Sequence, residues 1–275
     1  MASVVCGCMN CHSTRDWSRY SAPVTEGSFG KGGNSFGEDR GYPGTFVAGN
    51  LTPYGLGSWT DGEIFRAITQ GIHKDERPLY PVMPYRYYGQ MDSTDIIAII
   101  AWLRQLPPIP NDPPPNQTGL IMKLLMRLGP KHPEFHTKPD SNNLLAHGAY
   151  LLHAAGCHNC HSPRDQDRKP LPGRAFSGGR KFQTPLGNTL VSTNLTPDRQ
   201  SGIGNWTYQQ FADRFQIYAD SLYEPPLQGG QDERQTNMPW RQYGKLKPHD
   251  LYAMYLYLHS LPPVYRPELV NPTRP

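Results

Sequence analysis

Apolar residues in this chain recur at helical spacing in a few short segments, and the stretches between those segments are rich in polar residues, Gly and Pro. Leucines at positions 144, 145, 151 and 152 predict a helix over residues 142–155 that ends at Gly156. Two apolar-rich segments predict helices over residues 93–105 and 248–260, each stopped by the sequence Leu-Pro-Pro. The pattern therefore predicts an all-α, loop-rich fold of short helices.

Two more helix starts are marked by capping boxes, in which a Thr and an acidic or amide residue three positions later bind each other's backbone N–H groups. Thr60 with Glu63 predicts a helix through residues 64–68. Thr207 with Gln210 predicts a helix through residues 211–217. Each box directly follows a Trp, which is a first sign that the two halves of the chain are related.

The composition supports the loops and argues against two classes of protein. Gly and Pro account for 27 and 29 of the 275 residues, which predicts long irregular segments. The net charge is only +4, and charged residues make up 18% of the chain, so a dedicated nucleic-acid binder is not expected. The longest apolar runs hold eight residues, well short of the roughly 18 that a membrane-spanning helix needs.

The chain contains an internal repeat. The string Cys8–His12 returns 149 residues later as Cys157–His161, and Asn50–Pro53 returns as Asn194–Pro197. Three further pairs of strings follow in the same order: Gly55–Thr60 with Gly202–Thr207, Met83–Tyr85 with Met238–Trp240, and Leu106–Pro108 with Leu261–Pro263. Repetition of five strings in one order predicts two homologous domains.

The repeat places these domains at residues 1–108 and 142–275, with a linker over residues 109–141. The first part of the linker, residues 109–115, is Pro-rich and predicts a stiff, extended connector. Residues 120–128 predict a short apolar helix. We favour the interpretation that its apolar stripe packs across the two domains, and a membrane-surface or partner contact is the alternative.

Two strings of the form Cys-x-x-Cys-His carry the clearest chemistry: Cys8, Cys11 and His12 in the first copy, and Cys157, Cys160 and His161 in the second. In this pattern two thiols bond the vinyl groups of a haem, and the adjacent His binds the iron from one face. A structural zinc site needs four ligands, and the remaining cysteine, Cys6, cannot complete two such sites. A redox-active dithiol would leave the following His unexplained in both copies.

A low-spin haem for electron transfer needs a second axial ligand, and Met83 and Met238 are the candidates because they occupy the same place in the repeat. Met91, Met254 and His73 have no counterpart of the same type, so we expect them in the core or on the surface. The same absence of a counterpart leaves these histidines unassigned to iron: His147, His153, His158, His249 and His259.

The repeated Asn-Leu-Thr-Pro strings and the repeated Trp59 and Trp206 are candidates for shaping the edge of a haem. Buried propionates need hydrogen-bond donors or positive charge, and an indole N–H is a suitable donor. The alternative is that both Trp side chains are ordinary core aromatics.

The order of these motifs resembles that of bacterial dihaem c-type cytochromes, and more narrowly the cytochrome c subunits of periplasmic dehydrogenases of alcohols, aldehydes, gluconate or nicotinate. The resemblance covers the chain except for residues 111–140. It implies two tandem class I cytochrome c domains and two covalently bound haems c. The ligands that it implies are Cys8, Cys11, His12 and Met83 in the first domain, and Cys157, Cys160, His161 and Met238 in the second.

The resemblance also implies electron transfer without catalysis. A periplasmic dehydrogenase would be the donor, and an oxidase or another cytochrome the acceptor, with membrane-surface association as an option and no nucleic-acid partner. The alternative is a haem enzyme of the dihaem peroxidase type, which needs one iron with an open or displaceable position. Two matched Met ligands argue against that alternative.

The start of the chain departs from the family pattern. The counterpart of the helix over residues 142–155 would lie before Met1, so the first domain lacks most of its N-terminal helix. Residues 1–5 also show no secretory signal, although the resemblance implies a periplasmic protein. We therefore expect an N-terminally truncated sequence whose natural start lies upstream, with Cys6 as an unpaired thiol.

Overall fold

The computed structural model describes residues 1, 3–38, 41–129, 132–165, 169–183, 189–220, 222–225 and 236–270. Contacts between Cα atoms divide the chain into two compact units. Unit 1 is Met1–Lys138 and unit 2 is Pro139–Pro275. Each unit has its own helices and its own two-stranded sheet.

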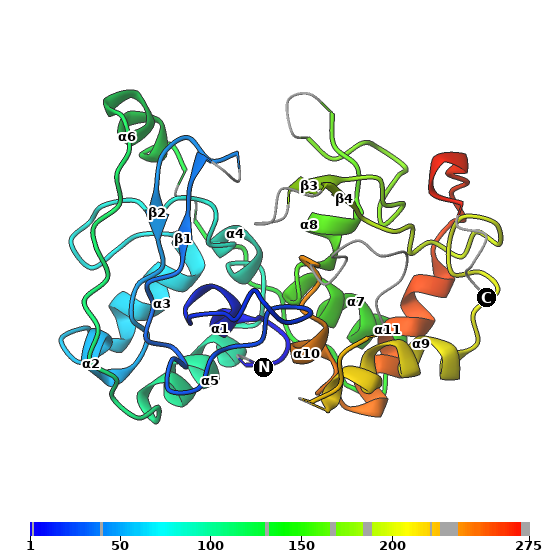
Figure 1. The fold of residues 1–275 in the computed structure, drawn as a ribbon, viewed down its shortest axis with the longest axis horizontal. Helices are drawn as coiled ribbons and strands as arrows, with labels where there is room; N and C mark the ends of the chain where they lie inside the picture. Colours follow the sequence, from blue (N-terminus) through cyan, green and yellow to red (C-terminus); the bar gives the residue numbers. More distant parts are fainter. Residues whose placement is uncertain are drawn as a thin grey trace. The chain divides into compact units, whose positions relative to one another are not determined.

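Unit 1 consists of short helices and long loops (Figure 1). Its elements are α1 (Cys8–Cys11), β1 (Ser35–Phe36), β2 (Phe46–Val47), α2 (Pro53–Leu56), α3 (Asp61–Gln70), α4 (Tyr85–Tyr88), α5 (Ser93–Arg104) and α6 (Leu120–Met126). The first predicted capping box is confirmed, because Glu63 N donates to Thr60 Oγ1 at 3.2 Å and Thr60 N donates to Glu63 Oε2 at 2.7 Å. The helix predicted over residues 93–105 is α5, and the Asp92 side chain caps it.

Unit 2 repeats the same kinds of element. They are α7 (Leu144–Ala154), α8 (Cys157–His161), β3 (Lys181–Gln183), β4 (Thr189–Val191), α9 (Tyr208–Gln216), the 3-10 helix η2 (Ile217–Ala219), α10 (Trp240–Tyr243), α11 (Pro248–Ser260) and the 3-10 helix η3 (Pro267–Leu269). The second capping box, Thr207 with Gln210, is confirmed at the start of α9. The last predicted helix matches α11, and Pro248 lies in its first turn as expected.

The packing of α7 against α11 forms the main apolar core of unit 2. Leu151 and Leu152 of α7 are buried, as are Leu251 and Leu258 of α11. Burial of an aliphatic side chain of this size stabilises a fold by about 1.5–3 kcal/mol. The close approach depends on Gly148, because a Cβ atom at this position would lie 2.1 Å from the backbone oxygen of Ala253.

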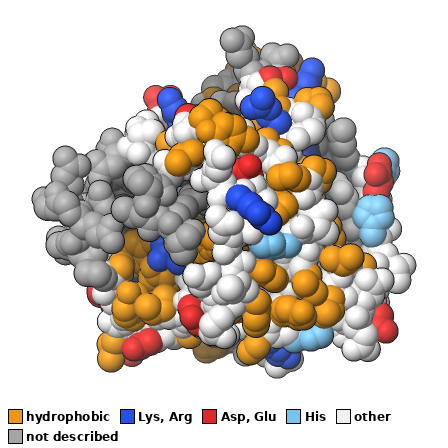
Figure 2. Space-filling view, turned by 90° about the vertical axis from the view of Figure 1, so that its right-hand side faces the viewer, with side chains coloured by type: hydrophobic (Ala, Val, Ile, Leu, Met, Phe, Trp, Pro, Cys, Tyr) orange, Lys and Arg blue, Asp and Glu red, His pale blue; other side chains and the backbone are white. Residues whose placement is uncertain are grey.

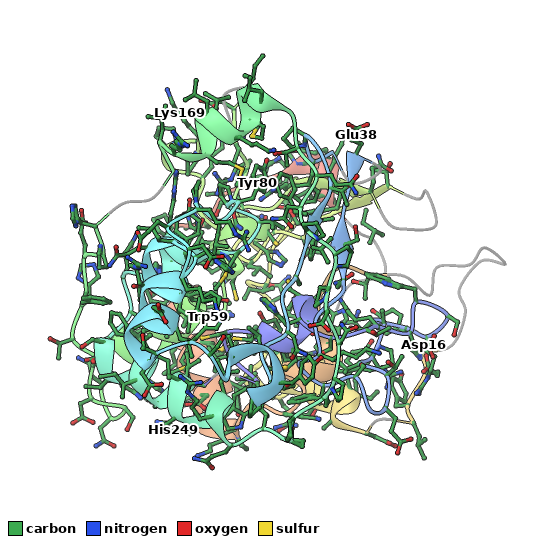
Figure 3. All side chains as sticks on the ribbon, turned by 90° about the vertical axis from the view of Figure 1, so that its left-hand side faces the viewer. Asp16, Glu38, Trp59, Tyr80, Lys169 and His249 are labelled. Carbon is green, nitrogen blue, oxygen red and sulfur yellow. The ribbon has the colours of Figure 1, made fainter. Side chains whose placement is uncertain are left out.

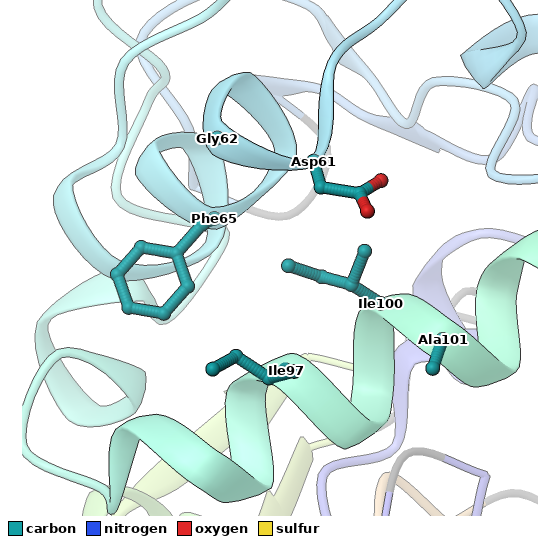
Figure 4. A pocket seen from close by; sticks show the side chains of 6 residues that line it. All are labelled: Asp61, Gly62, Phe65, Ile97, Ile100 and Ala101. Carbon is teal, nitrogen blue, oxygen red and sulfur yellow. The ribbon is translucent and has the colours of Figure 1, made fainter.

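The core of unit 1 lies along α5, where Ile96, Ile99 and Leu103 are buried. Ala98 of α5 is exposed, whereas Ala253, at the same repeat position in α11, is fully buried. A hollow of about 270 Å³ lies between α3 and α5 (Figure 4). It is lined by Asp61, Gly62, Phe65, Ile97, Ile100 and Ala101.

The two sheets correct the all-α prediction. β1 pairs with β2 in antiparallel fashion, and β3 pairs with β4 in the same way. Each strand has only two or three residues, which is too short for an alternation of apolar and polar positions to be recognised. The fold is therefore mainly helical and loop-rich, as predicted, with two small sheets in addition.

The segment after α5 is bound to unit 1 along its length. Asn50 Nδ2 donates to the backbone oxygen of Ile109 at 2.9 Å, and the backbones of Thr45 and Gln117 exchange two hydrogen bonds of 2.8 Å. The ammonium group of Lys138 lies 2.9 Å from the carboxylate of the buried Asp95. The apolar stripe of α6 is exposed on unit 1, and the interpretation that it packs across the two domains stays a prediction.

One face of the described residues carries its charge in a dispersed form. On the face drawn in Figure 2, Lys and Arg side chains are scattered among hydrophobic and uncharged ones. In the described part of the chain, no helix combines the length and the hydropathy needed to cross a bilayer.

Candidate functional site

The two Cys-x-x-Cys-His strings fold alike, each into a short helix after a left-handed glycine. α1 follows Gly7 and α8 follows Gly156, and both glycines have φ 68°. This backbone conformation is strained for a residue with a Cβ atom, which favours a glycine at both places. Within each helix the two cysteines are three residues apart and therefore point to the same side.

The first thiol of each string is a poor nucleophile because its pKa is raised. Burial, with the neighbouring Cys11 thiol, raises the pKa of Cys8 to about 12. Burial and Cys160 likewise raise the pKa of Cys157 to about 12. Dithiol oxidoreductases depend on a lowered thiol pKa, so this environment argues against the redox-dithiol alternative. All five cysteines lie among the described residues, and none of them forms a disulfide.

The two histidines are oriented by the same contact. His12 Nδ1 lies 2.7 Å from the backbone oxygen of Gly49, and His161 Nδ1 lies 2.9 Å from that of Thr193. A carbonyl oxygen only accepts, so Nδ1 carries the hydrogen and Nε2 of the neutral ring keeps its lone pair. Burial lowers the pKa of His12, and the bond to Gly49 acts in the opposite direction. Metal-binding histidines are commonly held by such a bond.

Met83 and Met238 lie in matching loops immediately before α4 and α10. The backbone oxygen of each accepts a 2.9 Å hydrogen bond, from Tyr85 N and Trp240 N respectively. α4 and α10 are each hydrogen-bonded to the segment that immediately precedes a Cys-x-x-Cys-His string.

Those ties are two equivalent tyrosine hydrogen bonds. Tyr88 Oη donates to Cys6 O at 2.8 Å, and Tyr243 Oη donates to Ala155 O at 2.9 Å. The structure thus brings the two cysteines and the histidine together directly in each unit, and it links the methionine loop to them through a tyrosine. Ligation by Met83 and Met238 stays a prediction.

The Asn-Leu-Thr-Pro strings form buried polar clusters that hold the end of each repeat. Asn50 Oδ1 accepts hydrogen bonds from the backbone N and the hydroxyl of Thr52, and its Nδ2 donates to Ile109 O and Asn111 O. Asn194 does the same in unit 2, with Thr196 and the backbone oxygen of Val264. These contacts give the strings a structural role that the sequence pattern did not specify.

The two repeated Trp side chains differ in their surroundings. Trp206 Nε1 is buried and has no hydrogen-bond partner within the described protein. The Trp59 ring, labelled in Figure 3, meets the His73 ring edge-on with centroids 4.5 Å apart. A buried indole N–H without a partner is a donor available to an anionic group. This orphaned donor fits a haem propionate in unit 2.

Sequence reasoning missed one pair of residues at the site, Asn34 and Arg180. Arg180 Nη1 donates to the backbone oxygen of Asn159 in α8, and Asn34 Nδ2 donates to that of Asn10 in α1 at 3.4 Å. A further repeated string, in which two glycines precede each of these residues, contains the signal that could have found them.

The donor set fits a haem better than a bare metal ion. Each unit offers two closely spaced thiols, one imidazole fixed through Nδ1 and a methionine loop tied to the same chain segment. In the described ranges there is no group of three or more His, Cys, Asp and Glu side chains that could hold a metal ion. The hollow beside α3 contains none of the predicted ligands.

Comparison with known proteins finds cytochromes among the relatives of this chain. The chain is 30% identical over 241 residues to the cytochrome c subunit of a quinone alcohol dehydrogenase from Gluconacetobacter polyoxogenes, an alignment that covers 80% of this chain and 49% of that subunit. It is 25% identical over 267 residues to a diheme cytochrome c-type protein from Cereibacter sphaeroides, with 94% of this chain and 83% of the relative covered.

A gluconate 2-dehydrogenase cytochrome c subunit from Pantoea cypripedii is 34% identical over 126 residues, which is 44% of this chain and 24% of that subunit. No protein-family profile matches the chain. The resemblance drawn from the motifs is confirmed: homologues of this chain are cytochrome c subunits of dehydrogenases and a dihaem cytochrome c. The chain spans about half the length of the alcohol dehydrogenase subunits it matches.

Proposed function

We propose that this protein transfers electrons through two covalently bound haems c, one in each of two tandem class I cytochrome c domains. Cys8 and Cys11 would hold the first haem, and Cys157 and Cys160 the second. The axial ligands would be His12 with Met83 and His161 with Met238. Bound in this way, haem iron supplies reversible one-electron exchange between its ferric and ferrous states.

One observation carries the proposal: in each unit, a backbone oxygen binds Nδ1 of the histidine of the Cys-x-x-Cys-His string. His12 binds the carbonyl of Gly49 and His161 that of Thr193, and these two acceptors stand just before the repeated Asn50 and Asn194. A structural motif alone would not require two histidines with the same ring orientation beside two pairs of cysteines. The names of the relatives support a cytochrome.

The residues around each string would keep the ligands fixed during electron exchange. The carbonyl bound to Nδ1 orients the imidazole ring, and the Asn50 and Asn194 clusters hold the loop that carries that carbonyl. A fixed ligand set is expected to change little between the two oxidation states, which suits an electron carrier. The relatives quoted above are cytochromes, which does not favour the dihaem peroxidase alternative.

The expected partners are a dehydrogenase as donor and an oxidase or another cytochrome as acceptor. Three of the relatives are named as cytochrome subunits of alcohol, gluconate and fructose dehydrogenases. Covalent haem attachment through paired thiols requires an extracytoplasmic, oxidising compartment, so we place the protein in the periplasm.

Intact mass spectrometry of the purified holoprotein tests the proposal. We expect a mass increase of two haems, and of one haem in each of two double variants, Cys8→Ser with Cys11→Ser and Cys157→Ser with Cys160→Ser. Cys6→Ser is the matched control and should keep both haems. A wild-type mass with one haem or none, or haem that acid-acetone extracts, would contradict the proposal.

A further inference from the structure

The segment that follows the last helix of each repeat, α5 in unit 1 and α11 in unit 2, makes one equivalent contact in both units. Asn111 and Arg266 occupy the same place in it, five residues after the leucine of the repeated Leu-Pro-Pro string. Asn111 Nδ2 donates to the backbone oxygen of Lys31 at 2.8 Å. Arg266 Nη1 donates to the equivalent oxygen, that of Ser177, at 3.2 Å. The donor is therefore a neutral amide in unit 1 and a charged guanidinium in unit 2.

This contact lies next to the histidine of each Cys-x-x-Cys-His string. The glycine after the acceptor residue is hydrogen-bonded to that histidine: Gly32 N donates to His12 O at 2.8 Å, and Gly178 N donates to His161 O at 2.7 Å. Arg266 Nη1 also donates to Gly178 O at 3.1 Å. Arg266 is 8% exposed, so water and salt screen its charge less than they screen a surface charge. Unit 2 thus holds a buried cation close to its candidate iron ligand.

A second repeat position shows the same exchange of side chains. Arg180 binds the backbone oxygen of Asn159, which lies between the two cysteines of α8, and Asn34 makes the equivalent contact with Asn10 in α1. Arg180 and Arg266 belong to different segments, one before and one after the helices of the repeat. Two separate contacts beside the candidate haem site therefore use Asn in unit 1 and Arg in unit 2.

The charges of the surrounding segment differ in the same direction. Between the Cys-x-x-Cys-His and Asn-Leu-Thr-Pro strings, residues 13–49 of unit 1 include four basic and four acidic residues. The matching residues 162–193 of unit 2 include six basic and two acidic residues. Over the whole units the counts are 13 basic and 12 acidic in unit 1, and 14 and 11 in unit 2. The positive surplus of unit 2 is therefore concentrated beside its candidate haem site.

Two charges act against this difference, and both are less buried than Arg266. Lys31 adds a cation to unit 1, but it is half-buried. Glu268 Oε1 lies 2.6 Å from Arg266 Nε, but the side chain of Glu268 is 55% exposed. Since solvent weakens the field of an exposed charge, these two residues reduce the difference between the units without cancelling it.

We propose that unit 2 holds the higher-potential haem of the pair, so that an electron taken up by unit 1 passes to unit 2. This inference rests on the proposed function, because it needs a haem in each unit. Nearby positive charge favours ferrous iron, which has one positive charge fewer than ferric iron. In the transfer, one electron leaves the ferrous haem of unit 1 and reduces the ferric haem of unit 2, so no further oxidant or reductant is required.

Reductive titration of the holoprotein to one electron per molecule tests this direction. We expect at least about ten molecules with the second haem reduced for each molecule with the first haem reduced, a ratio that corresponds to about 59 mV for one electron. Electron paramagnetic resonance of the haem that stays ferric measures the ratio. The two double cysteine variants described above should each keep one haem, and they supply the reference spectra.

Variants at the matched positions test the cause. Arg266→Asn gives unit 2 the side chain that unit 1 has at this place, and it should lower the higher of the two potentials so that the ratio falls about threefold. Asn111→Arg should raise the lower potential and reduce the ratio by a similar factor. Arg266→Lys is the control, because it keeps the charge and should keep the ratio. These shifts are measured on the protein with two haems, so they do not require a cysteine variant to fold.

The inference is overturned if most half-reduced molecules carry the electron on the first haem, or if Arg266→Asn leaves the ratio unchanged. It is also overturned if Arg266→Lys lowers the ratio as much as Arg266→Asn, because the contact and not the charge would then set the potential. Each of these results leaves two bound haems and the proposed function intact. A holoprotein whose mass shows fewer than two haems would instead contradict the proposed function, and this inference with it.

Discussion

Arg180 donates a hydrogen bond to the backbone oxygen of Asn159, inside the helix that carries the second Cys-x-x-Cys-His string. Asn34 makes the same contact in unit 1, where its neutral amide donates to Asn10 O. The two units therefore share this hydrogen bond, but the donor side chain is neutral in unit 1 and positively charged in unit 2. Burial raises the pKa of the nearby Cys160 thiol, and the positive charges of Arg180 and Arg164 act against that rise.

This difference predicts unequal reduction potentials for the two proposed haems. A nearby positive charge favours the reduced iron because that state has one positive charge fewer. Arg180→Asn should lower the potential of the second haem by about 40 mV, which corresponds to about 1 kcal/mol for one electron. The reverse variant, Asn34→Arg, should raise the potential of the first haem by a similar amount.

Spectroelectrochemical titration of the holoprotein measures both potentials. In each variant the other haem serves as the internal control and should keep its potential. If neither variant changes the potential of its haem relative to the wild type, these side chains do not act on the haems.

Much of the helical framework was predictable because its signals are local. The capping boxes at Thr60 and Thr207 and the terminal proline-bounded helices depend on neighbouring residues, and the structure agrees with them closely. The two sheets were not predictable, because pairing of such short strands depends on residues far apart, as between Ser35 and Val47.

The candidate ligands could be identified from the sequence because their spacing is strict and repeated. The residues that hold these ligands in place could not be identified in this way. His12 is held by a backbone oxygen, that of Gly49, and a backbone acceptor leaves no mark in the side-chain pattern. Asn50 also anchors Ile109 and Asn111, a contact that only the tertiary fold creates.

The proposed methionine ligands predict separable spectral changes. Met83→Ala should abolish the methionine-to-iron charge-transfer band of the first haem and lower its potential, and Met238→Ala should do the same for the second, because methionine ligation raises haem potential. Met91→Ala is a control for loss of a buried methionine, since Met91 is fully buried. Retention of the complete band in either ligand variant would mean that the ligand is a different residue.

The unpaired indole of Trp206 predicts a donor to the second haem. Its buried Nε1 has no partner within the described protein, and a propionate that accepted this N–H would be stabilised in its charged form. Trp206→Phe should therefore raise the propionate pKa and shift the pH dependence of the second potential to higher pH. Trp59→Phe should leave that haem unchanged. An unaltered pH profile in Trp206→Phe would assign this side chain to the core alone.

The crossing of α7 and α11 predicts that unit 2 does not tolerate a methyl group at position 148. A Cβ atom there would lie 2.1 Å from Ala253 O, a backbone atom that cannot move without separating the helices. Gly148→Ala should lower stability by about 1–3 kcal/mol or more and the melting temperature by about 5 °C or more.

Gly62→Ala in α3 is the matched control, because nothing lies within 4 Å of its Cβ position, and removal of a helical glycine stabilises by up to about 1 kcal/mol. Thermal unfolding followed by circular dichroism separates the two effects: equal melting temperatures for both variants would show that the helices do not approach as closely as Gly148 allows.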